Sequence, residues 1–286
     1  MRRLSCLALA ACCVPAPALA QPAPTVTPMP SAEDVANRDT ITLAGGIGTV
    51  PDYVGSDDYR LIPVAAIRGK VSGFSFSTRG TYLYVDAIPH HGASKVELNL
   101  GPIAGLRFNR TSRVKDPVVK QLPRLNKAFE VGAFAGMSFH GLVDAYDTLG
   151  LRLDVLHDIG NAHKSTTFSP NVEFSTPVSR TTYVSASLGA EFVSNKFADY
   201  YFSISPADSL RTGGALPVFN ANGGMKDWKL GLLLNQSITG DLLGGLSVFG
   251  TAQYSRLVGD FKRSPIVSQR GSANQWLAAA GLAYTW

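Results

Sequence analysis

The chain contains 286 residues, of which 26 are Lys or Arg and 21 are Asp or Glu, and its formal net charge is +5. Charged residues make up only 16% of the sequence, which is low for a protein whose whole surface meets water. The absence of a long basic run argues against nucleic acid as a partner. Beyond the N-terminus no stretch of about 18 uncharged apolar residues occurs, so no transmembrane helix is expected in the mature chain.

The first twenty residues have the features of a secretory signal peptide. Arg2 and Arg3 precede an apolar run, and Ala18-Leu19-Ala20 supplies small residues for cleavage. Removal of residues 1–20 takes Lys and Arg from 26 to 24 against 21 acids and leaves a net charge of +3. All three cysteines would leave with this segment, so neither disulfides nor cysteine metal sites are expected. The alternative is a lipoprotein box that ends at Cys12 and would place a lipid there.

A change of pattern divides the remaining chain in two. Residues 21–38 are rich in Pro, Ala and Thr and show no period, which predicts a flexible periplasmic lead-in. From residue 39 to residue 286 the apolar residues recur mostly at every second position, which is typical of strands with one apolar and one polar face. The expected strands are 40–50, 58–69, 71–86, 95–108, 128–140, 147–158, 165–177, 181–195, 225–239, 244–258 and 274–286.

Strand length decides between a soluble sandwich and a membrane barrel. Soluble strands average about 5 to 6 residues, whereas most of these runs reach ten or more, the length that a tilted strand needs to cross hydrocarbon. We therefore expect an all-β fold, a transmembrane antiparallel up-and-down β-barrel in contact with the outer-membrane lipid of a Gram-negative cell. The runs number eleven. Because such barrels have even strand numbers, we predict about 12 strands, with a short extra strand near Tyr200 to Ser205, and 10 strands as the fallback.

Seven charged residues fall on the polar faces of these strands and would project into one interior. Charges at that depth must pair with one another or meet water. A packed, salt-bridged interior is favoured over a selective channel, although a barrel of about twelve strands is wider than the eight-stranded kind that side chains fill. The predicted lumen charges are Glu97, Arg107, Glu130, Arg152, Asp154, Glu173 and Glu191.

The last strand alternates apolar residues and stops on an aromatic one. Outer-membrane barrels end in this way, usually on Phe, and the barrel-assembly machinery recognises the pattern. Leu282, Tyr284 and Trp286 are therefore a candidate assembly signal. The simpler interpretation is an aromatic girdle at the membrane interface, formed by Tyr84, Trp228, Tyr254, Tyr284 and Trp286.

A search for catalytic chemistry finds little. No Gly-rich phosphate loop, HExxH or GxSxG motif is present. His90 and His91 follow Ile88-Pro89, where a solvated loop pair is favoured over a metal site. His157-Asp158 and His163 suggest a dyad, but any polar turn contains such residues. We expect no enzyme activity, no cofactor and no bound metal.

The segment 51–60 combines turn-forming residues with a cluster of charges. Two interpretations stay open. The favoured one is a rigid turn whose Asp side chains cap its own amides, and the other is a rim loop that binds a cation through carboxylate oxygens. The residues concerned are Asp52, Tyr53, Asp57, Asp58 and Arg60.

Several blocks of sequence resemble the MipA/OmpV family of outer-membrane proteins. They are 51–60 (Pro-Asp-Tyr-Val-Gly-Ser-Asp-Asp-Tyr-Arg) with 77–80 (Ser-Thr-Arg-Gly), 129–133 (Phe-Glu-Val-Gly-Ala), and 254–260 (Tyr-Ser-Arg-Leu-Val-Gly-Asp) with 264–267 (Ser-Pro-Ile-Val) and 271–272 (Gly-Ser). Residues 115–127 depart from the family's usual loop.

The resemblance implies an outer-membrane adaptor between a membrane-bound murein lytic transglycosylase and a murein synthase. Other members are linked to osmotic or antibiotic response, adhesion or permeation, and the family brings no catalytic residues. In the resulting hypothesis the periplasmic turns or the lead-in dock murein enzymes, while the barrel is an anchor. The rival hypothesis, motivated by the mixed-charge lumen, is a narrow channel for small polar solutes.

Overall fold

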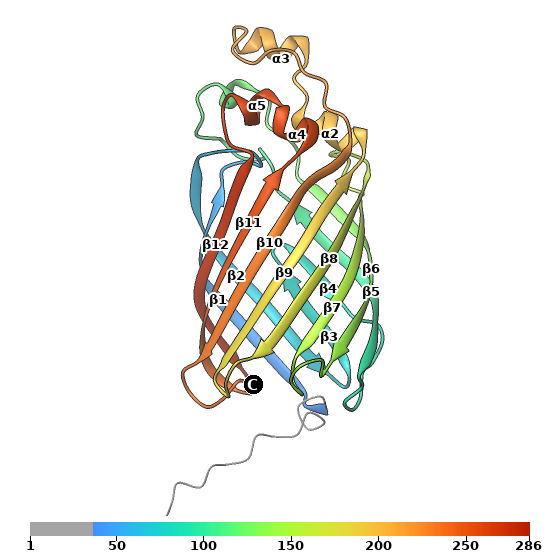
Figure 1. The fold of residues 1–286 in the computed structure, drawn as a ribbon. Helices are drawn as coiled ribbons and strands as arrows, with labels where there is room; N and C mark the ends of the chain where they lie inside the picture. The colour runs from blue at the N-terminus through green and yellow to red at the C-terminus, as the bar shows by residue number, and fades with distance from the viewer. Residues whose placement is uncertain (1–36) are drawn as a thin grey trace, which may run out of the picture.

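The computed structural model describes residues 37–286, which form twelve antiparallel strands closed into one barrel (Figure 1). Each strand pairs with its neighbours in sequence, and β1 pairs with β12 to close the ring. The expected fold class and strand number are therefore confirmed. The strands are β1 (Thr40–Pro51), β2 (Tyr59–Val71), β3 (Phe74–Arg79), β4 (Tyr82–Val85), β5 (Val96–Arg107), β6 (Ala128–His140), β7 (Thr148–Asp158), β8 (Thr166–Pro177), β9 (Thr182–Val193), β10 (Gly224–Ser237), β11 (Gly245–Leu257) and β12 (Asn274–Thr285).

The outer face of the barrel is apolar. Large aliphatic side chains such as Leu98 and Leu232 are 59% and 64% exposed. Such exposure costs free energy in water but not in contact with lipid. The rings of Trp228, Tyr254 and Trp276 pack together, with centroids 5.4 and 5.0 Å apart. These features make the chain an outer-membrane barrel.

Two details of the strand prediction were wrong. The run expected at 71–86 is two strands, because Gly80 adopts a φ of +59° and turns the chain between β3 and β4. The segment expected as an extra strand, 200–205, instead contains the end of helix α2 (Asn195–Phe202). Ser194 caps this helix by accepting from the Phe197 amide, and Phe197 and Tyr201 bury one face of it. Tyr84 also differs from the expected girdle, because its hydroxyl donates to Asp154 in the lumen.

The short β3–β4 hairpin leaves part of β2 at an edge. Strand β2 pairs with β3 only from Arg68 to Val71, although it pairs with β1 along its whole length. The Ile67 amide donates to the Thr78 side chain on that edge. Pro63 lies four residues earlier, on the same edge by the two-residue alternation, and has no N–H to offer another strand. A proline is one of the ways in which an exposed strand edge avoids pairing with other chains.

The two ends of the barrel differ. One end carries the long connections 108–127, 194–223 and 258–273, and the other carries shorter turns and both ends of the described chain (Figure 1). Outer-membrane barrels have short periplasmic turns and long extracellular loops, so we assign the helix-bearing end to the outside. At the periplasmic rim Asn37 accepts from the Gly92 amide and Asp39 from the Ser72 amide.

A helical cap closes the extracellular end. It comprises α2, α3 (Pro206–Arg211), α4 (Gly259–Arg263), α5 (Pro265–Ser268) and the single-turn helix η1 (Val119–Gln121). Four connections around the ring contribute to one buried apolar cluster, so the cluster must cross the mouth of the barrel. Its members include Tyr53, Val114, Val119, Leu122, Phe197, Tyr201, Phe202, Leu216, Phe261, Ile266 and Val267. None of the helices within residues 37–286 is long and apolar enough to span a membrane.

The predicted signal peptide, the lipid alternative at Cys12 and the lead-in up to residue 36 lie outside the described residues. These three interpretations remain sequence-based predictions.

The seam between β1 and β12 generates the first test. Gly46 faces Gly281 across the seam, and a Cβ at Gly46 would come within 2.1 Å of the Ala280 carbonyl oxygen. At the neighbouring Gly45 a Cβ would meet nothing within 4 Å. We expect Gly46→Ala to lower the free energy of unfolding by about 1 to 3 kcal/mol, the usual cost of overpacking, and Gly45→Ala to change it little. Urea unfolding of the barrel in vesicles measures both, and equal midpoints for the two variants would contradict the close seam.

Candidate functional site

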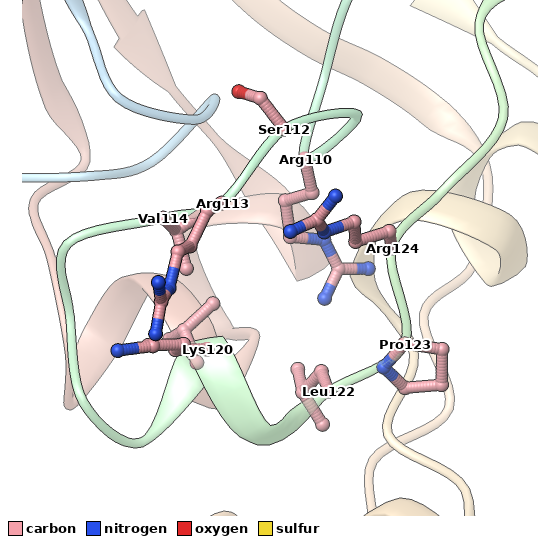
Figure 2. A pocket seen from close by; sticks show the side chains of 9 residues that line it. Arg110, Ser112, Arg113, Val114, Lys120, Leu122, Pro123 and Arg124 are labelled. Carbon is pink, nitrogen blue, oxygen red and sulfur yellow. The ribbon is translucent and has the colours of Figure 1, made fainter.

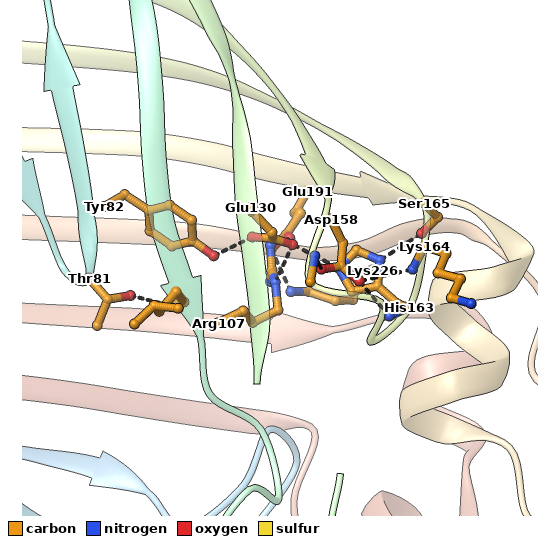
Figure 3. Close-up of polar contacts among 12 residues, drawn as sticks. Thr81, Tyr82, Arg107, Glu130, Asp158, His163, Lys164, Ser165, Glu191 and Lys226 are labelled. Atoms are coloured by element: carbon orange, nitrogen blue, oxygen red, sulfur yellow. Dashed lines mark hydrogen bonds and ion pairs between the residues drawn. The ribbon is translucent and has the colours of Figure 1, made fainter. Parts of the chain in front are cut away.

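The upper lumen, directly beneath the cap, contains a bridge of buried charges. Arg107 of β5 donates to Glu130 of β6, with Nε 2.9 Å from Oε1, and its terminal nitrogen lies 2.9 Å from Glu191 of β9 (Figure 3). The side chain of Glu130 is fully buried and that of Glu191 is 4% exposed. One guanidinium thus joins the β5–β6 wall to β9. Tyr82 of β4 also donates its hydroxyl to Glu130.

Two lysines from β10 complete the charge balance around Glu191. The ammonium groups of Lys226 and Lys229 lie 2.5 and 3.1 Å from its Oε2, and both also approach Asp227, at 3.4 and 3.6 Å. Simple alternation places Lys226 on the lipid face, beside Trp228. A register shift between Met225 and Asp227 interrupts the alternation, which lets Lys226 reach the interior. Strict alternation therefore cannot predict that Lys226 lies inside, whereas Lys229 already falls on the polar face of β10 and was not included among the predicted lumen charges.

His163 attaches the β7–β8 connection to the same bridge. Its Nε2 lies 2.9 Å from Glu130 Oε1, and its Nδ1 lies 2.8 Å from the Ser165 hydroxyl. A serine, a histidine and a carboxylate in line resemble a hydrolytic triad. The arrangement is enclosed, however, because Phe197 and Tyr201 of the cap cover the imidazole at ring distances of 4.9 and 5.7 Å. In this structure the three groups hold a connection in place and face no cleft.

The dyad that the sequence suggested, from His157-Asp158 and His163, is not formed. Asp158 accepts the backbone amides of Gly160, His163 and Lys164, so it orders the turn and does not meet the His163 ring. His157 points elsewhere, with its Nδ1 2.9 Å from Thr166.

The middle of the lumen holds a second group of charges. Arg152 donates to Asp154 at 2.8 Å, and the Tyr84 hydroxyl donates to the same carboxylate at 3.0 Å. Arg79 pairs with Glu173 at 2.9 Å, with side chains 44% and 30% exposed. The Arg79–Glu173 pair is therefore more exposed to solvent than the carboxylates of the bridge under the cap, whereas the Arg152–Asp154 pair, at 16% and 7%, is not.

The third group lies near the periplasmic mouth. Glu97 contacts His140 at 3.3 Å and His90 at 3.7 Å, and His90 also lies 3.3 Å from Asp86. The expectation that His90 is a solvated loop residue was therefore wrong, because its side chain is only 10% exposed. Asn99 donates to Asp86, which links the β4–β5 connection to the wall. Each of the seven predicted lumen charges thus has an oppositely charged or histidine neighbour.

The 51–60 segment is built into the cap. The Tyr53 hydroxyl donates to the carbonyls of Ile266 and Arg270, and buried Asp52 accepts from the Lys115 amide and lies 3.8 Å from Arg60. A turn is present, but its own amide at Asp58 is capped by the Ser56 hydroxyl. Asp57 is exposed, away from buried Asp52. Within residues 37–286 no group of three or more His, Cys, Asp or Glu side chains is placed to hold a metal ion.

The proposed assembly residues share the outer face of β12. Leu282, Tyr284 and Trp286 are 53%, 43% and 58% exposed, and the two aromatic rings lie 4.7 Å apart. They flank the seam with β1 at the periplasmic end. Their role as a signal remains a prediction.

Residues 43–286 match the family model described as MltA-interacting protein MipA. The chain belongs to the MipA family. The match covers nearly the whole barrel and its cap, in agreement with the resemblance seen in the sequence. No curated protein matches the chain.

Solved structures that are similar to this chain include outer-membrane channels. An outer-membrane channel from Pseudomonas putida F1 is 10% identical with a TM-score of 0.40, covering 87% of this chain and 96% of its own. The CymD monoaromatic hydrocarbon channel is 8% identical with a TM-score of 0.39, covering 87% and 88%. A loop L8 deletion mutant of OmpT from Vibrio cholerae is 7% identical with a TM-score of 0.34, covering 87% and 99%.

The bridge beneath the cap generates the second test. Glu191→Gln leaves Arg107 and Lys226 buried without a full counter-charge, and breaking a buried ion pair costs about 3 to 5 kcal/mol. We expect a loss of this size in the free energy of unfolding, measured by urea titration in vesicles. Glu173→Gln is the matched control, because its partner Arg79 is 44% exposed and such pairs contribute about 0 to 1 kcal/mol. Equal losses for the two variants would refute the central role of Glu191.

Proposed function

We propose that this protein is a non-enzymatic outer-membrane anchor whose periplasmic end docks a murein lytic transglycosylase, and through it a murein synthase. The observation that carries the proposal is an exposed apolar tip on the β6–β7 turn. Val143 is 91% exposed and Leu142 is 54% exposed, on the side of the membrane where murein lies. The family description, MltA-interacting protein, supports this class of partner.

The apolar tip is preorganised. Buried Asp147 accepts from the backbone amides of Leu142, Val143 and Asp144 at 2.7, 2.7 and 3.0 Å. These amide donors, that of Asp144 first, lower the pKa of Asp147 and keep the carboxylate charged. A turn held in one conformation loses little entropy when a partner covers it. Val178 on the β8–β9 turn and Ile238 on the β10–β11 turn are further exposed aliphatic residues at this end of the barrel.

The cap argues against the channel hypothesis. The apolar cluster crosses the extracellular mouth, and the bridge of Arg107, Glu130 and Glu191 lies beneath it. The half-exposed pair of Arg79 and Glu173 lower in the lumen favours water entry from the periplasmic side. These features favour a lumen that is open to the periplasm and closed at its extracellular end. A solute channel is the second candidate function, and it would require the cap to open.

The docking proposal predicts a loss of partner capture when the tip becomes polar. Leu142→Ser combined with Val143→Ser should reduce crosslinked recovery of a murein transglycosylase from solubilised envelopes by about tenfold, since two desolvated aliphatic contacts contribute well over 1.4 kcal/mol. Leu210→Ser is the control, because Leu210 is 82% exposed on α3 at the opposite end. A separate variant that lacks residues 21–37 measures how much the lead-in contributes to recovery of the transglycosylase. The proposal fails if gentle crosslinking of the unaltered protein recovers no murein enzyme.

Conductance measurements in planar bilayers test whether the cap closes the extracellular mouth of the barrel. The unaltered protein should give no stable unitary conductance, whereas replacing residues 195–222 by a short Gly-Ser linker should open one, because α2 and Leu216 leave the apolar cluster. Removing α3 alone is the control, since none of its residues is buried. A heat-modified gel shift verifies insertion of each variant. Stable conductance of the unaltered protein, with selectivity changed by Glu130→Gln or Arg152→Gln, would favour the channel instead.

A further inference from the structure

A small basic cavity lies in the extracellular cap, within the β5–β6 connection (Figure 2). Its volume is about 240 Å³, several times the share of one liquid water, about 30 Å³. Four of the nine lining residues are cationic, and Val119, Leu122 and Pro123 supply apolar contacts. The cationic residues are Arg110, Arg113, Lys120 and Arg124.

Arg110 is the buried member of this set. It is only 7% exposed, and its terminal nitrogen donates to the Tyr201 carbonyl at 3.3 Å. Its Nε is buried and meets no hydrogen-bond acceptor. Burial lowers the pKa of Arg110 to about 10, and the attraction of Tyr53 and Asp208 offsets only part of the lost solvation. A buried donor without a partner costs free energy, so the site lacks one acceptor.

The acidic residue of this connection does not supply that acceptor. Asp116 is bound by Arg270 of the β11–β12 connection, with nitrogen to oxygen distances of 2.6 and 3.1 Å. It also accepts the amides of Val118 and Val119. Among residues 37–286, none of the four cationic side chains around the cavity forms an ion pair within 4.0 Å. The cavity therefore concentrates positive charge that the protein leaves unbalanced.

We propose that this cavity binds a phosphate-type oxyanion, either a free ion or a phosphomonoester carried by a glycolipid headgroup. Guanidinium groups present forked donors that match the oxygens of phosphate, and the Nε of Arg110 would gain its acceptor. Exposed Arg113, Lys120 and Arg124 at the rim would attract the anion from the extracellular side. This site is independent of the proposed periplasmic docking.

Isothermal titration of the full barrel in detergent with inorganic phosphate tests the proposal. Saturable binding is expected, weakened about tenfold or more in Arg110→Gln and in the double variant Arg113→Gln with Arg124→Gln, since a charge-assisted hydrogen bond contributes more than one factor of ten. The double variant changes only exposed side chains, so it keeps the test valid if Arg110→Gln misfolds. Lys127→Gln is the matched control, because Lys127 belongs to the same connection and lies over Phe108, outside the cavity.

A second arm identifies the source of the phosphate. Phosphatidylcholine vesicles containing diphosphoryl lipid A compete with inorganic phosphate if the site takes a headgroup, and fail to compete if it takes the free ion. Both results support a phosphate site. Absence of saturable phosphate binding, or equal binding in the double variant and in Lys127→Gln, would overturn it.

Discussion

The contact on which the rest of the structure depends is the bridge from Arg107 to Glu130 and Glu191. A twelve-stranded ring encloses more space than side chains of one layer fill, so its upper lumen needs long side chains that cross it. Arg107 crosses from β5 to β9. With Lys226 and Lys229 it makes three cations, which match the three carboxylates Glu130, Glu191 and Asp227. Glu130, Glu191, Lys226 and Asp227 are at most 5% exposed, and the cost of burying a charge must be offset by pairing. The bridge therefore fixes the positions of β5, β6 and β9 relative to one another directly beneath the cap.

The cap resembles the interior of a soluble domain more than a set of surface loops. Connections from different sides of the ring bury Tyr53, Phe197, Phe261 and Ile266 together. Polar contacts fix their relative positions, such as the Ser264 hydroxyl on the Phe202 carbonyl and Arg270 on Asp116. At the base, His163 joins the cap to Glu130. The lumen and the cap are thus one connected network.

This architecture separates the two faces of the molecule. The extracellular end carries the helical cap and its basic cavity, whereas the periplasmic end carries the exposed aliphatic turns and the start of the described chain. The bridge carboxylates Glu130 and Glu191 are 0% and 4% exposed, whereas Glu173 in the middle of the lumen is 30% exposed and Glu97 near the periplasmic mouth is 18% exposed.

The sequence by itself determined the barrel, because alternation over ten or more residues is a local property of each strand and lipid requires it. It also predicted seven lumen charges, because residues such as Arg107 and Glu130 fall on the polar face of their own strands. The partners were decided by tertiary structure, because Glu191 meets Arg107 across 84 positions of sequence only once the ring closes. The bulge that brings Lys226 inward, the turn at Gly80 and the helix at Asn195–Phe202 escaped prediction for a related reason. The bulge and the helix depend on how a segment packs against distant residues, and the turn depends on the positive φ of one glycine. Alternation along a strand carries no information about either.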